Sequence, residues 1–584
     1  MRAMMAGARH VFERQEYLNK INVFPVPDAD TGTNMAATLR SVLDGVSQLQ
    51  PVPIQESSRT VAESALLGAR GNSGVILAQY LYGLSEEIGR ESRLTTEQFG
   101  RAVQRAVRYA YEALSQPREG TILTVMRDWA DWVQEHAHIK QDFAELLTKG
   151  LEVANHSLEA TREKLAELRQ SKVVDAGAQG FVDFLSGITH FIRDGKIRDL
   201  LHFRTPVLEE VAHTDIDLAD IRYRYCTECL IEGQNIDLKG LRNRIEHFGD
   251  SLVLAGSRLK ARLHIHTNEP AMVFQQARQQ GELVQQKADD MHMQFRVTHS
   301  AHPPIALVVD SACDLPSDFI EEHGIHVVPV RLNFGPSSYI DKITITPDLF
   351  YQMLGSEKQH PRTSQPSPAD FKNLYHFLLS HYESVISIHI PAAVSGTHQN
   401  AVAMAREVDA DRISVIDGKS LSIGMGAVVE QAARSIAAGK SHREIIREIK
   451  DYTAQTKVFV AIPSLKYLMR SGRVSRLKGI VASLLNVKPI LELDENGVPQ
   501  HAAQSLSWKS AHRRLLRMAT QFGQQKSRPA FKIAHADNRG LAESMAREIR
   551  GLFRVQKIDI LPVSPVLGAH AGKGAIAVSI AWEE

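Results

Sequence analysis

The sequence has few features of secreted, membrane-spanning or nucleic-acid-binding proteins. Only 3 of its 584 residues are cysteine, which argues against a disulfide-stabilised extracellular scaffold. Lysine and arginine total 68 against 67 aspartates and glutamates, so no overall charge attracts nucleic acid or an anionic membrane. No apolar run approaches the roughly 20 residues that cross a bilayer, and the first 20 residues lack the long apolar region and small-residue cleavage site that are typical of a signal peptide. We therefore expect a cytoplasmic protein with no transmembrane segment and no nucleic-acid partner.

The length and the changing sequence pattern predict a multidomain protein with three regions. A chain of 584 residues exceeds the roughly 250 to 300 residues at which a single core stops growing. Over residues 1–200 apolar residues recur every three or four positions, which predicts an all-α domain with one long helix over 141–168. Residues 201–300 mix strand-like and helix-like segments, which predicts a middle α+β domain. In residues 303–584 β-branched runs alternate with amphipathic helices, which predicts an α/β domain with a mostly parallel sheet.

Two aspartates precede a predicted helix near the amino terminus, in "PDADTGTNM" at 27–35. Asp28 and Asp30 are two residues apart, so in extended backbone their carboxylates point to the same side. Carboxylate oxygens suit Mg²⁺, which completes its shell with water and phosphate oxygens. The helix that begins near Thr31 would direct its N–H groups at the same place. The segment therefore predicts a nucleotide-phosphate site, and the alternative is a helix capped by Asp and Thr after a proline-rich turn.

The longer segment "INVFPVPDADTGTNM" resembles the nucleotide-binding signature of the dihydroxyacetone-kinase-like (DhaL/DAK2) domain of bacterial fatty acid kinases. Segments 66–79, 117–126 and 173–181 resemble its other motifs, in the same order. The resemblance implies an eight-helix barrel that binds ATP through Mg²⁺. It makes Asp28 and Asp30 the catalytic metal ligands and Asn22 a third ligand candidate, while Ala29 replaces a usual glycine. The implied ATP-binding residues are Thr31, Thr33, Asn34, Asn72, Ser73, Gly74 and Asp175.

Residues 303–584 resemble the DegV family, whose members bind fatty acids and supply the acyl substrate to fatty acid kinases. The matching segments are 308–316, 361–371, 395–401, 467–475, 487–497 and 567–578. The resemblance implies a two-lobed α/β protein that buries one acyl chain. Because a half-buried carboxylate needs hydroxyl or charged donors, the fatty-acid-binding candidates are Thr363, Ser364, Ser395, Arg473 and His570.

This candidate head-group site departs from the DegV pattern at one place. Pro391 and Ala392 stand where the family usually has two serines. If one of those serines normally contacts the carboxylate, either Ser395 or Thr397 supplies the missing hydroxyl, or head-group binding is weakened. Taken one at a time, each candidate also has an ordinary structural explanation, such as a helix cap, a surface charge or a loop histidine.

The middle region contains a candidate metal site. Cys226 lies in "YCTEC", and His264 and His266 lie in "LHIHTN". Alternate residues on a strand share a face, so the two imidazoles and a thiolate from a neighbouring strand could chelate one Zn²⁺. Cys229 is an odd number of positions from Cys226 and would therefore point to the opposite face of the strand, so it is not included. The region resembles the corresponding part of fatty acid kinases, and the alternative is a buried polar cluster that stiffens the sheet.

Together these patterns predict a fatty acid kinase that uses ATP to convert a bound fatty acid carboxylate into an acyl phosphate for phospholipid synthesis. Such a carboxylate is already ionised at pH 7, so no general base is needed. The predicted partners are the fatty acid and ATP, and the sequence leaves open a homodimer and transient contact with a membrane or an acyltransferase. Two alternatives are a kinase for a small polyol such as dihydroxyacetone and a non-catalytic fatty-acid-binding sensor.

Overall fold

The computed structural model describes residues 2–24, 30–47, 53–89, 91–140, 142–195, 221–299, 302–357, 359–472 and 487–582. Two compact units make up the chain, residues 1–296 and 297–584, and each is described by itself. The predicted site residues Asp28 and Arg473, together with Ala29, lie outside the described residues. None of the described helices is both long enough and apolar enough to cross a membrane.

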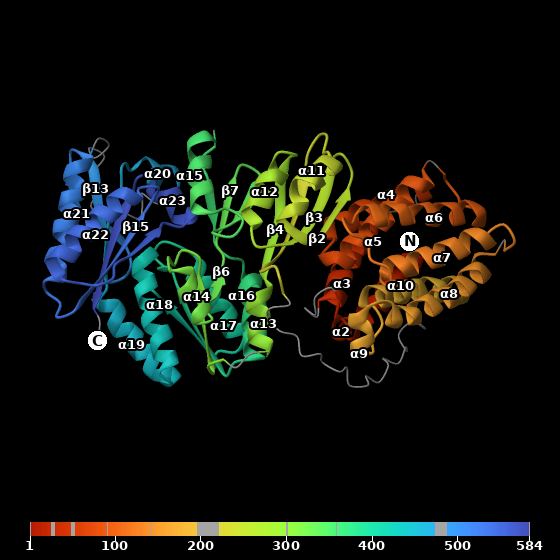
Figure 1. Ribbon diagram of the computed structural model, residues 1–584, viewed down its shortest axis with the longest axis horizontal. Coiled ribbons are helices and arrows are strands. Elements are labelled where there is room, and N and C mark those ends of the chain that lie inside the picture. The colour runs from red at the N-terminus through yellow and green to blue at the C-terminus, as the bar shows by residue number, and fades with distance from the viewer. Residues whose placement is uncertain are drawn as a thin grey trace. The chain divides into compact units, whose positions relative to one another are not determined.

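The first unit begins with an all-helical region, shown in red to orange in Figure 1. Eight of its described helices are 12 to 22 residues long: α1 (Arg2–Glu13), α3 (Thr31–Ser47), α4 (Ile54–Gly68), α5 (Gly71–Ile88), α6 (Thr96–Glu112), α7 (Ile122–His136), α8 (Phe143–Lys164) and α10 (Ala176–Asp194). Each packs on the next one in this order, and α10 packs on α1, so the ring of long helices closes. Two six-residue helices, α2 (Gln15–Lys20) and α9 (Ala166–Ser171), complete the region.

Local sequence explains where these helices begin and end. At the start of α6 the Thr95 hydroxyl accepts from the backbone N–H of Gln98, and the Gln98 side chain accepts from the Thr95 N–H, which is a capping box. The single long helix predicted over 141–168 is wrong, because Leu165 has extended backbone and separates α8 from α9. Leu165 and Leu168 both stay buried, so the break redirects the chain while keeping its apolar residues in the core.

The middle region is a four-stranded antiparallel sheet in the order β2-β3-β1-β4. Its strands are β1 (Tyr225–Glu232), β2 (Gly249–Gly256), β3 (Lys260–Thr267) and β4 (Glu282–Asp290). Helices α11 (Leu238–Ile245) and α12 (Pro270–Arg278) pack against one face through an apolar cluster that includes Cys229. Cys226, His264 and His266 have the opposite parity. A short 3₁₀ helix, Glu246–Phe248, precedes β2, and α13 (Met291–His299) follows β4.

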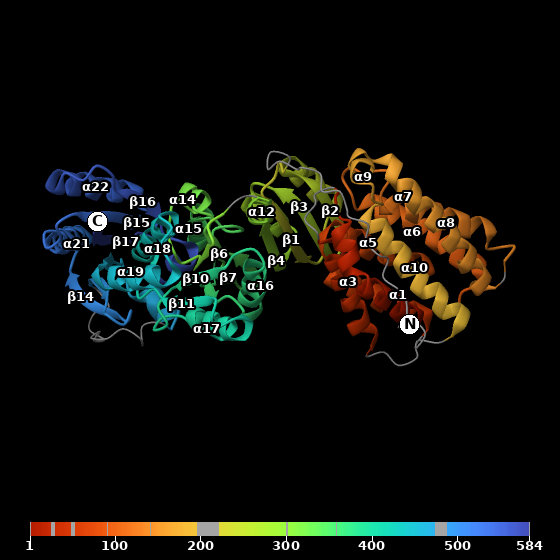
Figure 2. The same ribbon diagram turned by 90° about the horizontal axis from the view of Figure 1, so that it is seen from below.

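The sheet is joined to the helical region by backbone hydrogen bonds. The segment after α6 pairs with the edge strand β2, since the Ser115 N–H donates to the Leu252 carbonyl and the Leu254 N–H donates to the Ala113 carbonyl. The Arg242 guanidinium donates to three carbonyls at the end of α6, where a cation also complements the helix dipole. The helical and middle regions therefore form one compact unit (Figure 2).

The second unit contains three described sheets. The four-stranded sheet β11-β10-β5-β6 is parallel, the three-stranded sheet β8-β7-β9 is antiparallel, and the six-stranded sheet β14-β13-β12-β17-β15-β16 has one parallel pair only. The expectation of a mostly parallel sheet is therefore wrong for the six-stranded sheet. One of its antiparallel pairs, β13 with β14, is a hairpin closed by the turn "DENG" at 494–497.

The strands of this unit are β5 (Ile305–Asp310), β6 (His326–Val328), β7 (Arg331–Phe334), β8 (Ser337–Ile340), β9 (Arg362–Ser364), β10 (Ser384–His389), β11 (Ile413–Asp417), β12 (Lys457–Ala461), β13 (Lys488–Leu493), β14 (Pro499–Ser505), β15 (Pro529–His535), β16 (Asp559–Pro562) and β17 (Ile576–Trp582). Its helices are α14 (Ser317–Glu322), α15 (Pro347–Ser356), α16 (Pro368–Leu379), α17 (Thr397–Val408), α18 (Ser422–Ala437), α19 (His442–Gln455), α20 (Lys466–Arg470), α21 (Trp508–Gly523), α22 (Arg539–Phe553) and α23 (Pro565–Ala571). Separate apolar clusters lie against the parallel and the six-stranded sheets, as expected for an α/β region.

Candidate functional sites

The first unit contains a small cavity where predicted residues from two regions meet. Its volume is about 30 Å³, room for an ion with little water rather than for a whole nucleotide. Six of the residues predicted to bind metal or ATP line it, together with the three predicted zinc ligands of the middle region. The complete lining is Asn22, Phe24, Asp30, Thr31, Asn34, Gly71, Asn72, Ser73, Cys226, His264 and His266.

The amino-terminal turns of α3 and α5 form one side of this cavity. Helix α3 begins at Thr31, as the sequence predicts, and the Asn34 N–H donates to the Asp30 carbonyl. Helix α5 begins at Gly71, whose φ is +56°. A Cβ at Gly71 would lie 2.2 Å from Nδ2 of Asn34, so the close approach of the two turns requires glycine there. Two helix amino termini and the Asp30 carboxylate thus face the same space, a donor set suited to phosphate and its counter-cation.

Three predicted ATP-binding residues do not line the cavity. The Thr33 hydroxyl accepts from Asn19 and Gln15, which ties α3 to α2. Gly74 lets α5 pack closely on α3, because a Cβ there would lie 2.5 Å from the Thr38 hydroxyl oxygen. Asp175 caps α10. Their part in ATP binding stays a prediction.

Asp175 is a buried carboxylate with a role in stability. Its Oδ2 accepts from the N–H of Ala178 at 2.8 Å and from the N–H of Ile122 at 3.1 Å, so it joins the start of α10 to the start of α7. Burial raises the pKa of Asp175 to about 6, against the opposing effect of these backbone donors. The folded protein therefore binds this proton more tightly than the unfolded chain does.

The raised pKa predicts a pH-dependent gain of stability for Asp175→Asn, which keeps the cap and removes the charge. The cost of burying the charge is absent below the unfolded pKa of 3.8, grows between that value and about 6, and is constant at higher pH. We expect the variant to match the wild-type free energy of unfolding near pH 3 and to exceed it by about 3 kcal/mol at pH 7. Denaturant unfolding at several pH values measures this difference, and equal stability at pH 7 would contradict it.

Cys226, His264 and His266 form a buried cluster on adjacent strands. The register of β1 and β3 places Cys226 opposite His266 and Glu228 opposite His264. One ligand atom from each of the three predicted residues lies within 4.8 Å of the others. Nδ1 of His264 lies 3.1 Å from Glu228 Oε1, and Nδ1 of His266 lies 3.5 Å from Asp250 Oδ1. The buried Nε2 of His264 has no hydrogen-bond partner among the described residues.

This arrangement has the donor chemistry of a metal site. Histidine ligands typically donate their second N–H to a carboxylate, as both histidines are placed to do here, and sulfur with imidazole nitrogen suits Zn²⁺. Burial lowers the pKa of His266 and raises the pKa of the Cys226 thiol. Without a cation Cys226 and His266 are therefore neutral, and the thiol loses its proton when a metal binds. The cluster could hold a metal.

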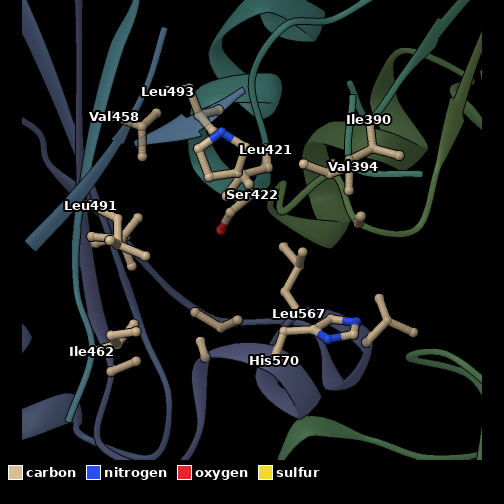
Figure 3. A pocket seen from close by; sticks show the side chains of 18 of the residues that line it. Ile390, Val394, Leu421, Ser422, Val458, Ile462, Leu491, Leu493, Leu567 and His570 are labelled. Carbon is tan, nitrogen blue, oxygen red and sulfur yellow. The ribbon is translucent and has the colours of Figure 1, made fainter. Parts of the chain in front are cut away.

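The second unit contains a larger apolar cavity of about 170 Å³ (Figure 3). The labelled side chains come from β12, β13 and α23, from residues directly beside β12 and at the start of α18, and from the loop between β10 and α17, and most are aliphatic. Three predicted fatty-acid-binding residues, Thr363, Ser395 and His570, are in its lining. Its apolar lining includes Val330, Ile390, Val394, Leu421, Val458, Val460, Ile462, Leu468, Leu491, Leu493, Val563, Val566 and Leu567.

A hydroxyl–imidazole pair provides polar atoms at this cavity. Thr363 Oγ1 lies 3.1 Å from Nε2 of His570. The helix that carries His570, α23, is fixed at its start, since the Ser564 N–H donates to Asp314 and the Val566 N–H donates to Asp341, both buried carboxylates. The pair is thus held in place by the fold, and it can offer hydrogen-bond donors to an anionic head group.

Of the two remaining described head-group candidates, Ser395 lines the cavity and Ser364 does not. Of the two suggested replacements for the missing serines, Ser395 lines the cavity and the buried Thr397 does not. The hydroxyl oxygen of Ser395 lies 2.8 Å from that of Thr397. The exposed Ser364 does not line the cavity, and its hydroxyl accepts from Asn333. Sequence reasoning missed Ser422 and Glu492 in this lining. It also missed Glu228, although Glu228 shares strand parity with Cys226.

Comparison with known proteins matches three parts of the chain to three protein families. Residues 25–190 match the DAK2 domain family, residues 222–298 match the family of middle domains of FakA-like fatty acid kinases, and residues 304–583 match the DegV family. These matches confirm the resemblances read from the sequence. The chain therefore combines a DAK2-type domain, a FakA-like middle domain and a DegV-type domain.

The relatives of this chain are similar over part of its length. An uncharacterized protein of Staphylococcus epidermidis is 34% identical over 305 residues, 50% of this chain and 54% of that protein. An uncharacterized protein of Staphylococcus aureus is 35% identical over 318 residues, 52% and 58% respectively. The chain thus spans little more than half the length of these curated relatives.

Among solved structures, fatty-acid-binding DegV proteins of Thermus thermophilus and Bacillus subtilis are each 28% identical, with a TM-score of 0.45. Each comparison covers 48% of this chain and 100% of the other chain.

Proposed function

We propose that this protein is a fatty acid kinase, with a DAK2 domain that binds Mg-ATP and a DegV domain that holds the acyl substrate. The observation that carries the proposal is the combination, in one chain of these families, of two distinct cavities. One has the Asp30 carboxylate and two helix amino termini, and the other is apolar with a hydroxyl–imidazole pair. The proposed domains are residues 1–200, 201–300 and 303–584.

In the nucleotide site, Asp30, Asp28 and Asn22 are proposed to hold Mg²⁺. The first-turn residues Thr31 and Asn34, together with Asn72 and Ser73, are proposed to hold ATP phosphates. Bound Mg²⁺ would neutralise charge on the phosphates. The Asn72 side-chain oxygen is buried with no hydrogen-bond partner among the described residues, which leaves it available to a bound water or ligand. We place Zn²⁺ at Cys226, His264 and His266, because sulfur and nitrogen donors differ from the oxygen donors that Mg²⁺ prefers.

In the DegV domain, Thr363, Ser395 and His570, with Arg473, are proposed to orient the fatty acid carboxylate. A carboxylate oxygen attacks the γ-phosphorus of ATP, the bond from that phosphorus to the bridging oxygen breaks, and ADP leaves with the electron pair. The products are an acyl phosphate and ADP. No proton has to be removed from the attacking group, because a carboxylic acid is ionised at pH 7. The acyl phosphate would serve phospholipid synthesis.

A hydroxylamine trap tests the proposed reaction. Purified protein is incubated with Mg-ATP and oleate, and hydroxylamine converts any acyl phosphate to a hydroxamate. We expect hydroxamate in proportion to the ADP released, and no comparable ADP release when dihydroxyacetone replaces oleate. Turnover with dihydroxyacetone alone would support the small-polyol kinase instead. Oleate binding without turnover of either compound would support the non-catalytic sensor.

A further inference from the structure

One carboxylate in the first unit contacts both the candidate nucleotide site and the candidate metal cluster. Glu228 lies on β1, buried, between the two sets of residues. Its Oε1 accepts from the backbone N–H of Gly71 at 2.6 Å and lies 3.1 Å from Nδ1 of His264. Its Oε2 accepts from the Arg262 guanidinium at 3.2 Å. A single oxygen atom of the middle domain therefore touches the first residue of α5 and the imidazole of a candidate metal ligand.

A cation at the cluster would fix the ring of His264. A metal bound at Nε2 leaves the ring proton on Nδ1, where it is donated to Glu228 Oε1, so the ring and the carboxylate are held in one orientation. The buried Nε2 has no hydrogen-bond partner among the described residues, so without the cation none of the described residues holds that end of the ring through a hydrogen bond. The position of the imidazole, and with it that of Glu228, therefore depends on the cation.

Glu228 also holds the first turn of α5, through its hydrogen bond with Gly71. The Gly71 N–H is one of the first N–H groups of α5, which have no partner within the helix, and Glu228 accepts it. Gly71 has positive φ and lies against Asn34. Asn72 and Ser73, which follow directly, line the cavity proposed for the phosphates. A shift of Glu228 would therefore shift the turn that presents these two side chains.

We propose that Glu228 is a positioning residue that transmits cation occupancy of the Cys226–His264–His266 cluster to the nucleotide-binding turn at Gly71. The inference rests on the proposed function, because it takes Asn72 and Ser73 to contact the nucleotide. It assigns the metal cluster a role in nucleotide affinity, through an oxygen that touches no substrate. The coupling is reciprocal, so bound nucleotide should also increase retention of the cation.

The test measures Mg-ADP affinity by calorimetry in the full-length protein at three zinc states: as purified, stripped with a zinc-selective chelator, and restored with Zn²⁺. Mg²⁺ is kept in excess throughout, and metal content is measured for each sample. For the wild type we expect stripping to weaken Mg-ADP binding about tenfold and Zn²⁺ to restore it. In Glu228→Ala we expect weak binding that zinc does not change.

Two further variants keep the comparison specific. Glu228→Met combined with Arg262→Met removes the carboxylate without leaving a buried charge unpaired, and should behave as Glu228→Ala does. Gln285→Asn is the matched control, because Gln285 accepts from the same Arg262 but touches neither Gly71 nor His264. Asparagine also tolerates the positive φ of this position. It should respond to zinc as the wild type does.

A second readout reports the turn directly. Hydrogen exchange, followed by mass spectrometry of the peptide 69–75, should slow when Zn²⁺ is restored to the wild type and should not change in the double variant. Equal Mg-ADP affinity in stripped and restored wild type, or an unchanged zinc response in folded Glu228 variants, would overturn the inference alone. If the wild type bound no nucleotide in any state, the proposed function would fail and the inference with it.

Discussion

Asp30→Ala should reduce acyl phosphate formation by about a hundredfold or more, the usual cost of removing one group that stabilises charge in a reacting centre. Asp30 is the described acidic residue that lines the candidate nucleotide cavity, directly before α3. Without its carboxylate, Mg²⁺ would lose a ligand and the phosphates would lose their main source of charge neutralisation. The rate of hydroxamate formation at saturating Mg-ATP and oleate measures the effect.

A control on the same helix separates this effect from a general loss of acidic charge. Asp44 also lies on α3, exposed, and is not in the cavity lining. Asp44→Ala should retain the wild-type rate. Zinc content has to be measured in parallel, because the Asp30 charge also acts on Cys226 and His266. A full rate in Asp30→Ala with unchanged zinc would place the magnesium site elsewhere.

Val394→Trp should abolish fatty acid binding while the protein stays folded. Val394 is a half-buried loop residue whose side chain lines the apolar cavity beside Ile390 and Leu421 (Figure 3). An indole there would occupy space that we assign to the acyl chain or its head group, and close-packed interiors do not absorb such a volume. Thermal unfolding with and without oleate measures the result, since a ligand at a hundred times its Kd stabilises the folded state by about 2.7 kcal/mol.

The wild type should therefore show a clear rise in Tm with oleate, and Val394→Trp should show none. Leu552→Trp is a matched control, because Leu552 is an exposed aliphatic residue of the same unit outside the cavity lining. It should keep the wild-type shift. An oleate-dependent rise in Tm that survives in Val394→Trp would show that this cavity is not where the fatty acid binds.

The helical region was predictable because its information is local. Apolar residues at threes and fours define each helix, and the turn residues around Thr31 and Gly71 mark where α3 and α5 begin. The break at Leu165 was not predictable, because the apolar pattern continues through it and only packing decides the change of direction. Strand direction in the six-stranded sheet was not predictable either, because the alternation of strands and helices does not say which strands become neighbours, and four of its five strand pairs are antiparallel.

The sequence by itself determined the order of the three regions, the residue types at the candidate sites, and the shared face of His264 and His266. Only the tertiary structure decided that Asp30, Asn72 and Cys226 line one cavity, and that Thr363 meets His570. Tertiary structure also decided the contact of Glu228 with Gly71, 157 positions apart. Periodicity describes neighbours along one element, whereas such contacts depend on strand register and on how helices pack against a sheet, which the whole chain settles together.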